Sequence, residues 1–195
     1  MHQVFQQGAY PDETYSGVTD TFLASYRPDT SWAHYDSLKI SGRSWGTERA
    51  LVHFDLHEQI PTNAQVSSAK LSLYAWSKRS VLGMRVSAYE VTRSWDVGVA
   101  TWQRASSGEM WGMPGCDEVN TDRKGYPEAS RFVYFVNQFY EWDITSAAQR
   151  WVADPSNNNG IMLTDSAVSQ EVRFRSSEWR TAPQRPKLTI IYTMP

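Results

Sequence analysis

Aromatic and cationic side chains alternate in the middle of the chain in a pattern that suits sugar binding. Tyr74 and Trp76 share one face of a predicted strand, and Arg85 begins the next predicted strand. If Lys78 pairs with Gly83 around a four-residue turn, Trp76 lies opposite Arg85 on the outward side of a hairpin. Pyranose C–H groups stack on indole or phenol rings, while Arg and Lys bond sugar hydroxyls and carboxylates. We therefore predict a ligand-binding surface made by Tyr74, Trp76, Lys78 and Arg85. An outer sheet face with one tryptophan partly covered by a loop explains the pattern equally well.

A second basic stripe occurs near the end of the chain. Arg173 and Arg175 alternate with the apolar residues Val172 and Phe174, so both arginines should point outward from a strand. We include the two arginines among the candidate ligand-binding residues. Ordinary solvation of a surface strand is the alternative interpretation.

Carboxylates that could act in catalysis are present, but their spacing does not indicate an active site. Asp55, Asp143 and Glu178 could in principle supply the two acids of a glycosidase, which stand about 5–10 Å apart. Acid–arginine pairs that include Arg185 and fix strand ends explain these residues without chemistry. The chain has neither a phosphate-cradling glycine motif nor a Gly-x-Ser-x-Gly nucleophile elbow. We expect no catalytic residues.

Possible metal ligands are also scattered along the chain. His53, Asp55 and His57 share one face of a predicted strand, but same-face neighbours lie about 6.6 Å apart, too far for three to converge easily. A surface histidine pair is the simpler interpretation. Asp117, Asn120 and Asp122 could offer oxygen ligands, but their spacing does not match that of a calcium-binding loop. We expect no cofactor. A structural calcium ion is the one metal that we keep as an alternative.

The composition excludes several classes of partner. The 195 residues carry a net charge of −2, with 19 basic and 21 acidic residues spread along the chain, so no bulk charge favours nucleic acid or an anionic membrane. No stretch approaches the length of a membrane span, and residues 1–7 lack the basic and apolar regions of a signal peptide. Cys116 is the single cysteine, which excludes an intrachain disulfide without fixing the compartment.

Short segments with period-two alternation recur between turn residues along the whole chain. This pattern predicts an all-β, jelly-roll-like antiparallel β-sandwich that forms a single domain over residues 1–195. One short helix is predicted over 146–153, from a capping-box spacing at its start and the stop at Asp154-Pro155. Residues 106–129 form the longest irregular segment, of a kind that is usually functional or disordered. The predicted strands are 21–25, 37–40, 50–56, 69–76, 85–91, 132–142, 160–164, 172–176 and 187–192.

Tryptophan is abundant, with nine in the chain, and the rings could serve either a core or a sugar-stacking face. Trp95, Trp102, Trp142 and Trp151 stand beside apolar periodic residues, which favours burial over ligand contact. We predict that these four rings belong to the core.

Ordered short motifs extend along nearly the whole chain and together are similar to one family. The chain resembles the DNRLRE module, grouped with the family-96 carbohydrate-binding modules, a jelly-roll-like sandwich found in secreted polysaccharide-degrading and surface proteins. It departs from that family at Ser31-Trp32-Ala33 and at His53. The matching motifs are Phe5-Gln6-Gln7-Gly8, Asp20-Thr21-Phe22-Leu23, residues 49–56 with Ile60-Pro61, residues 68–73, Ser94-Trp95 with Thr101-Trp102, Trp142-Asp143-Ile144-Thr145, Trp151-Val152, residues 158–163, Ser176-Ser177-Glu178 and Arg185-Pro186-Lys187-Leu188.

The resemblance implies glycan binding, often of acidic polysaccharide. We therefore expect a non-catalytic carbohydrate-binding module for a uronate-containing polysaccharide, outside the cell or on its surface and joined to other domains of a larger secreted protein. We expect neither nucleic-acid binding nor membrane insertion. Two other functions stay open: a structural or adhesive cell-surface module whose tryptophans are all buried, and a small polysaccharide hydrolase or lyase.

Overall fold

The computed structural model describes residues 1–43, 46–79, 82–165 and 170–195. Within these ranges, eleven strands and one α-helix confirm the predicted all-β, sandwich-like fold. Two 3₁₀ turns, Pro155–Asn157 and Ala182–Gln184, follow α1 and precede the last strand. The elements are β1 (His2–Phe5), β2 (Val18–Ala24), β3 (Ser37–Arg43), β4 (Gly46–Phe54), β5 (Gln65–Lys78), β6 (Met84–Glu90), β7 (Ala129–Val133), β8 (Gln138–Asp143), α1 (Thr145–Ala153), β9 (Ile161–Asp165), β10 (Glu171–Arg175) and β11 (Lys187–Thr193).

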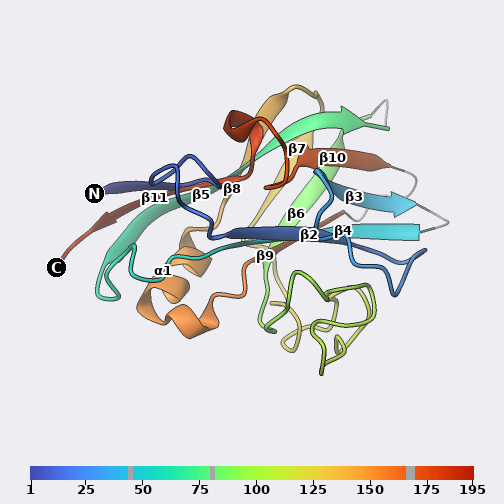
Figure 1. The fold of residues 1–195 in the computed structure, drawn as a ribbon, viewed down its shortest axis with the longest axis horizontal. Coiled ribbons are helices and arrows are strands. Elements are labelled where there is room, and N and C mark those ends of the chain that lie inside the picture. Colours follow the sequence, from blue (N-terminus) through green and yellow to red (C-terminus); the bar gives the residue numbers. More distant parts are fainter. Residues whose placement is uncertain (44–45, 80–81, 166–169) are drawn as a thin grey trace.

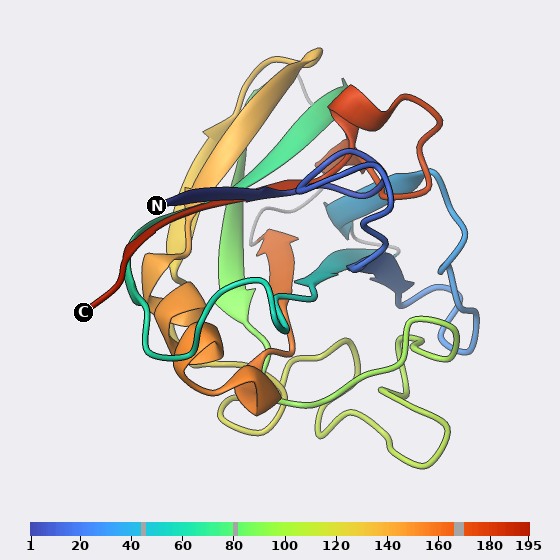
Figure 2. The ribbon, with the colours of Figure 1, turned by 60° about the vertical axis from the view of Figure 1, so that its left-hand side comes forward.

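The strands pair in antiparallel fashion into one curled sheet with the order β1-β11-β5-β10-β3-β4-β9-β6-β7. β2 pairs with β4 and β8 pairs with β5, both off this path. In both views the layer of β1, β11 and β5 lies above the layer of β2, β4 and β9 (Figures 1 and 2). The two layers therefore give the sheet the shape of a sandwich, with α1 at one end.

The main core lies between the two layers. Leu71 and Leu73 of β5 face Val52 of β4 and Leu163 of β9 in one cluster of buried side chains. Trp142 packs edge-on against Phe174 in this cluster, and its indole N–H donates to the Val86 carbonyl. Period-two alternation places every second residue of these strands in the core, as the sequence pattern predicts.

A second core lies on the other side of β2, β4 and β9. Residues 91–128, here called the long loop, hang below these strands in Figure 2. The loop covers Leu23, Leu51 and Met162 with Trp111 and other apolar residues of its own. The irregular segment predicted over 106–129 is thus a cover for the sheet, and both faces of β4 are buried.

One carboxylate organises the long loop. Asp122 accepts hydrogen bonds from the backbone N–H groups of Gly112, Met113 and Glu118, and from Nε of Arg93 at 2.8 Å. Burial raises the pKa of Asp122, but these donors lower it by more, so the net pKa lies below the ordinary value. The loop keeps its shape because it folds around a satisfied anion.

Three predicted elements need correction. The single strand predicted over 132–142 is two strands, β7 and β8, because the chain turns at Asn137 with a φ of 63°. The helix is confirmed, but the predicted capping box does not cap it. Asp143 instead accepts from both the backbone N–H and the hydroxyl of Thr145. Strand β1 was not predicted from the sequence. Among the described residues, no helix has the length and apolar character needed to cross a membrane.

Candidate functional site

The predicted hairpin between β5 and β6 is wrong. β5 pairs with β11, β8 and β10, whereas β6 pairs with β9 and β7. Arg85 consequently lies opposite Phe132 of β7 and not opposite Trp76. The physical reason is that both edges of β5 are occupied by other strands, so the chain must cross to the other layer before β6. The predicted turn includes residues 80–81, which lie outside the described residues.

Tyr74 and Trp76 keep their predicted outward position, but Lys78 does not join them. A register shift between Arg173 and Phe174 places Lys78 opposite Val172, a fully buried core residue. Paired residues share one face of a sheet. The bulge therefore takes Lys78 off the face that carries the aromatic residues, a change that alternation alone cannot reveal.

Arg175 replaces Arg85 as the cation beside Trp76. Its guanidinium carbon lies 4.1 Å from the centroid of the Trp76 ring and 3.4 Å from that of Trp179, so the cation contacts two indoles. Within the described part of the chain, Nε1 of Trp76 and Nε of Arg175 have no hydrogen-bond partner. Burial lowers the pKa of Arg175, yet a guanidinium remains charged at neutral pH. The structure thus joins one residue from each of the two predicted surfaces.

The position of Trp179 is fixed from two sides. Nε1 of Trp179 donates to Gln184 Oε1 at 3.0 Å, and Nε of Arg185 donates to the Trp179 carbonyl at 2.6 Å. A second nitrogen of Arg185 donates to the carbonyl of Gln7. Arg185 was predicted to pair with an acid, and it binds backbone carbonyls instead. Trp179 was missed because its loop has no strand periodicity, although a tryptophan in the loop that follows a strand is a usable signal.

The aromatic surface continues from Trp76 across β5 to β8. Tyr74 lies edge-on to Phe139 with ring centroids 5.2 Å apart, and the two residues are directly paired. Lys187 of β11 places its Nζ 5.3 Å from the Phe139 centroid. We call Tyr74, Trp76, Phe139, Arg175, Trp179 and Lys187 the β5 platform. It combines ring faces with two cations on the outer side of one layer.

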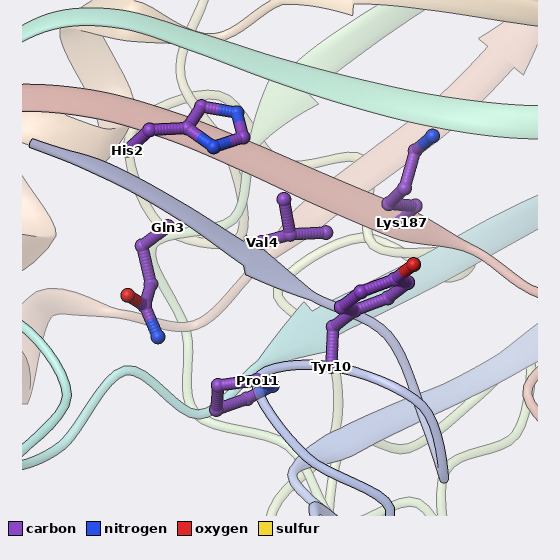
Figure 3. Close-up of a pocket in the computed structure, with 6 residues that line it drawn as sticks. All are labelled: His2, Gln3, Val4, Tyr10, Pro11 and Lys187. Carbon is purple, nitrogen blue, oxygen red and sulfur yellow. The ribbon is translucent and has the colours of Figure 1, made fainter.

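A shallow pocket opens beside the β5 platform. It has a volume of about 450 Å³ and shares Lys187 with the platform. Figure 3 shows His2, Val4 and Lys187 projecting from the same side of β1 and β11, with Tyr10 beside them. A second hollow of about 410 Å³ is also lined by Tyr10 and Lys187. The platform therefore borders two hollows that share Tyr10 and Lys187.

The other predicted arginine, Arg173, is already bonded inside the protein. Its Nε lies 2.5 Å from Oε1 of Glu171, a buried carboxylate that also pairs with Arg43. This internal ion pair offsets part of the charge that Arg173 could offer a ligand. Arg175 is the member of the predicted basic stripe that contacts Trp76.

The acids near the platform are also paired. Lys70 Nζ lies 2.5 Å from Asp143, and Ser72 donates to Glu141. The hydrogen bonds from Lys70 and Thr145 lower the pKa of Asp143 to about 2. Asp143 is therefore ionised at neutral pH and paired with Lys70.

The histidines and acids weighed as metal ligands have other partners. His53 is half-buried, with its Nδ1 3.4 Å from the Thr19 hydroxyl, and burial lowers its pKa. The carboxylate oxygens of Asp117 accept hydrogen bonds from Arg49 and Arg123, so they are already bonded within the protein. In the described ranges, no group of three or more His, Cys, Asp or Glu side chains could hold a metal ion.

The four tryptophans assigned to the core divide into two pairs. Trp142 and Trp151 are fully buried in the main core, as predicted. Trp95 and Trp102 are only half-buried and pack against the second core. The predicted core position thus holds only in part for this pair, which packs at the edge of the second core and not between the layers. Trp111 is the buried tryptophan of that loop.

A family match covers most of the sandwich. Residues 20–190 match the Disaggregatase related repeat domain. The chain belongs to this family. The match runs from β2 into β11 and so includes all the platform residues, whereas His2 and Tyr10 of the pocket precede it. No curated protein matches the chain in sequence.

Proposed function

We propose that this repeat domain is a non-catalytic carbohydrate-binding module that holds an acidic polysaccharide on the β5 platform. The observation that carries the proposal is the stack of Arg175 between Trp76 and Trp179, beside the exposed ring of Phe139. Aromatic faces attract the C–H groups of a pyranose ring, and cations attract carboxylates. A surface with both chemistries suits a uronate-containing chain.

Two further points support this function. The family is described as a repeat domain, which fits a binding unit within a larger chain more readily than a self-contained enzyme. The sequence also resembles the DNRLRE modules, for which the same class of ligand is expected. A polysaccharide ligand implies that the module acts outside the cell or at its surface, next to other domains of a secreted protein.

Calorimetric titration of the whole chain with oligouronates and neutral oligosaccharides tests the proposal. Wild type should bind the uronates, and added salt should weaken binding because exposed charges are screened. Trp179→Ala should lower the affinity about tenfold or more, and Arg175→Gln should also reduce the salt dependence. Tyr126→Ala and Arg104→Gln, at exposed positions of the long loop, should bind like wild type.

Each outcome decides between the three functions. Absence of binding to every glycan, with the fold intact, would overturn the proposal in favour of a structural or adhesive module. Release of reducing ends or of unsaturated products from the polysaccharide would instead indicate a hydrolase or lyase. Full affinity in both Trp179→Ala and Arg175→Gln would remove the β5 platform as the site.

A further inference from the structure

A second group of exposed aromatic rings lies at the end of β7 and on the loop that joins β7 to β8. Phe132 and Tyr134 project from the same face, with ring centroids 4.6 Å apart and planes inclined by 30°. Their residues are 43% and 52% exposed, and Phe135 at the turn is 70% exposed. Large aromatic residues gathered at this exposure are uncommon on a soluble domain unless they contact a partner.

The two rings rest on a glycine. A Cβ atom at Gly83 would stand 2.3 Å from Cε1 of Phe132 and 2.8 Å from Cδ1 of Tyr134, so no side chain fits there. Gly83 is itself buried beneath the rings. The backbone at Gly83 therefore packs against one side of both rings, while their other sides are exposed to solvent.

The hydroxyl of Tyr140 ties the loop between β7 and β8 to β8. It accepts from the backbone N–H groups of Tyr134 and Phe135 and donates to the Phe135 carbonyl. Arg131 of β7 adds a 2.6 Å bond from its Nε to the Glu141 carbonyl of β8. The rings are thus held before any ligand arrives, which reduces the entropy lost on binding.

Polar groups border the rings on the side of β6. Arg85 is exposed and directly paired with Phe132. Ser87 and Ser130 form the next pair along the same face of the sheet, and their hydroxyls lie 2.8 Å apart. Ring surfaces beside one exposed arginine and two hydroxyls resemble the β5 platform in chemistry. A purely apolar protein partner would leave Arg85 without a counter-charge.

We propose that Phe132, Tyr134 and Arg85 form a second sugar-stacking site, which binds the same acidic polysaccharide at another point along its chain. The inference rests on the proposed function of the β5 platform. Two sites on one rigid domain convert the second contact into an intramolecular step, so a long chain binds more tightly than a short one. Arg85, which the sequence analysis placed in one surface with Trp76, thus belongs to this second site.

Binding of a long polyuronate and of a short oligouronate, measured side by side, tests the second site. The Phe132→Ala/Tyr134→Ala double variant should lose about tenfold or more in affinity for the long chain. Combining it with Trp179→Ala should abolish detectable binding. Phe132→Trp with Tyr134 intact should retain wild-type affinity, because a larger ring preserves stacking. Arg85→Gln should lower the affinity and the salt dependence, while Tyr126→Ala should change neither.

The results separate this inference from the proposal on which it rests. Wild-type affinity for both ligands in the double variant and in Arg85→Gln, with Trp179→Ala still impaired, would overturn the second site and leave the first. Loss of binding in the double variant alone, with Trp179→Ala unimpaired, would support the second site and remove the first. Concentration-dependent association of wild type that the double variant lacks, with unchanged glycan affinity, would make this aromatic group a protein interface and overturn the inference.

Discussion

Nε of Arg185 donates a 2.6 Å hydrogen bond to the backbone carbonyl of Trp179. A residue outside the aromatic stack thus holds one of the two indoles that flank Arg175. Arg185 also binds the carbonyl of Gln7, so one guanidinium ties the loop before β11 to the loop after β1. The position of Trp179 in the β5 platform thus depends on Arg185, whose planar guanidinium donates to two carbonyls at once although Arg185 is not a platform residue.

Arg185→Lys should therefore weaken ligand binding although residue 185 is not part of the platform. A lysine cannot reach both carbonyls in the same geometry, so Trp179 should lose its fixed position. We expect a several-fold loss of oligouronate affinity and a decrease of about 1–2 kcal/mol in the free energy of unfolding. Arg180→Lys is the matched control: the exposed Arg180 guanidinium lies 5.5 Å from the centroid of the Trp179 ring and lysine keeps the charge, so the affinity should be unchanged. Equal affinity in Arg185→Lys and wild type would show that Arg185 does not position the ring.

Trp142→Ala should destabilise the domain far more than Trp95→Ala. Trp142 is fully buried in the main core, and its loss should lower the free energy of unfolding by roughly 3–5 kcal/mol. Trp95 is half-buried and bonds to the Asn159 carbonyl, so its replacement should cost less. Urea denaturation of both variants measures the difference. Similar losses would mean that the long loop contributes as much to stability as the space between the layers.

Asp20 should make the domain less stable as the pH rises from about 4 to 7. It is fully buried, one of its oxygens has no partner in the described structure, and burial raises its pKa to about 7. Above the pKa of about 4 that Asp has in an unfolded chain, the unfolded state ionises first and is favoured. The free energy of unfolding should therefore fall by up to roughly 4 kcal/mol over this range and level off above pH 7.

Asp20→Asn removes the titrating group but keeps an oxygen that can accept from the Ser177 N–H. We expect denaturation midpoints of this variant to change much less between pH 4 and 7 than those of wild type. Asp29→Asn, at an exposed position, should keep the wild-type pH profile. A wild-type slope that persists in Asp20→Asn would assign the pH dependence to another group.

Arg150→Met should destabilise the helix end of the sandwich. Arg150 bonds to Glu90 and Glu128, two carboxylates with side-chain exposures of 4% and 6%. Without the cation, both acids would be buried with no ion-pair partner at this position, at a cost of roughly 2–4 kcal/mol. Glu90→Gln in the Arg150→Met background should recover part of that loss, since Trp151 can still donate to the amide oxygen. Thermal unfolding of the single and double variants measures both effects.

The sequence determined most of the fold by itself. Nine predicted strand segments correspond to observed strands, with one of them split in two, and the helix ends just before Asp154-Pro155 as predicted. The outward positions of Tyr74, Trp76 and Arg175 also follow from alternation, because side chains of a strand point to opposite faces in turn. Such features are local, and local spacing is what a sequence records directly.

Only the tertiary structure decided which of these outward residues meet. Trp76 and Arg175 are 99 positions apart in the chain, and they come together because β5 pairs with β10 and not with its neighbour β6. Arg85 faces Phe132 for the same reason, and a single bulge takes Lys78 off the aromatic face. Strand pairing depends on which edges remain open once all layers are packed, a property of the whole chain that no short spacing contains.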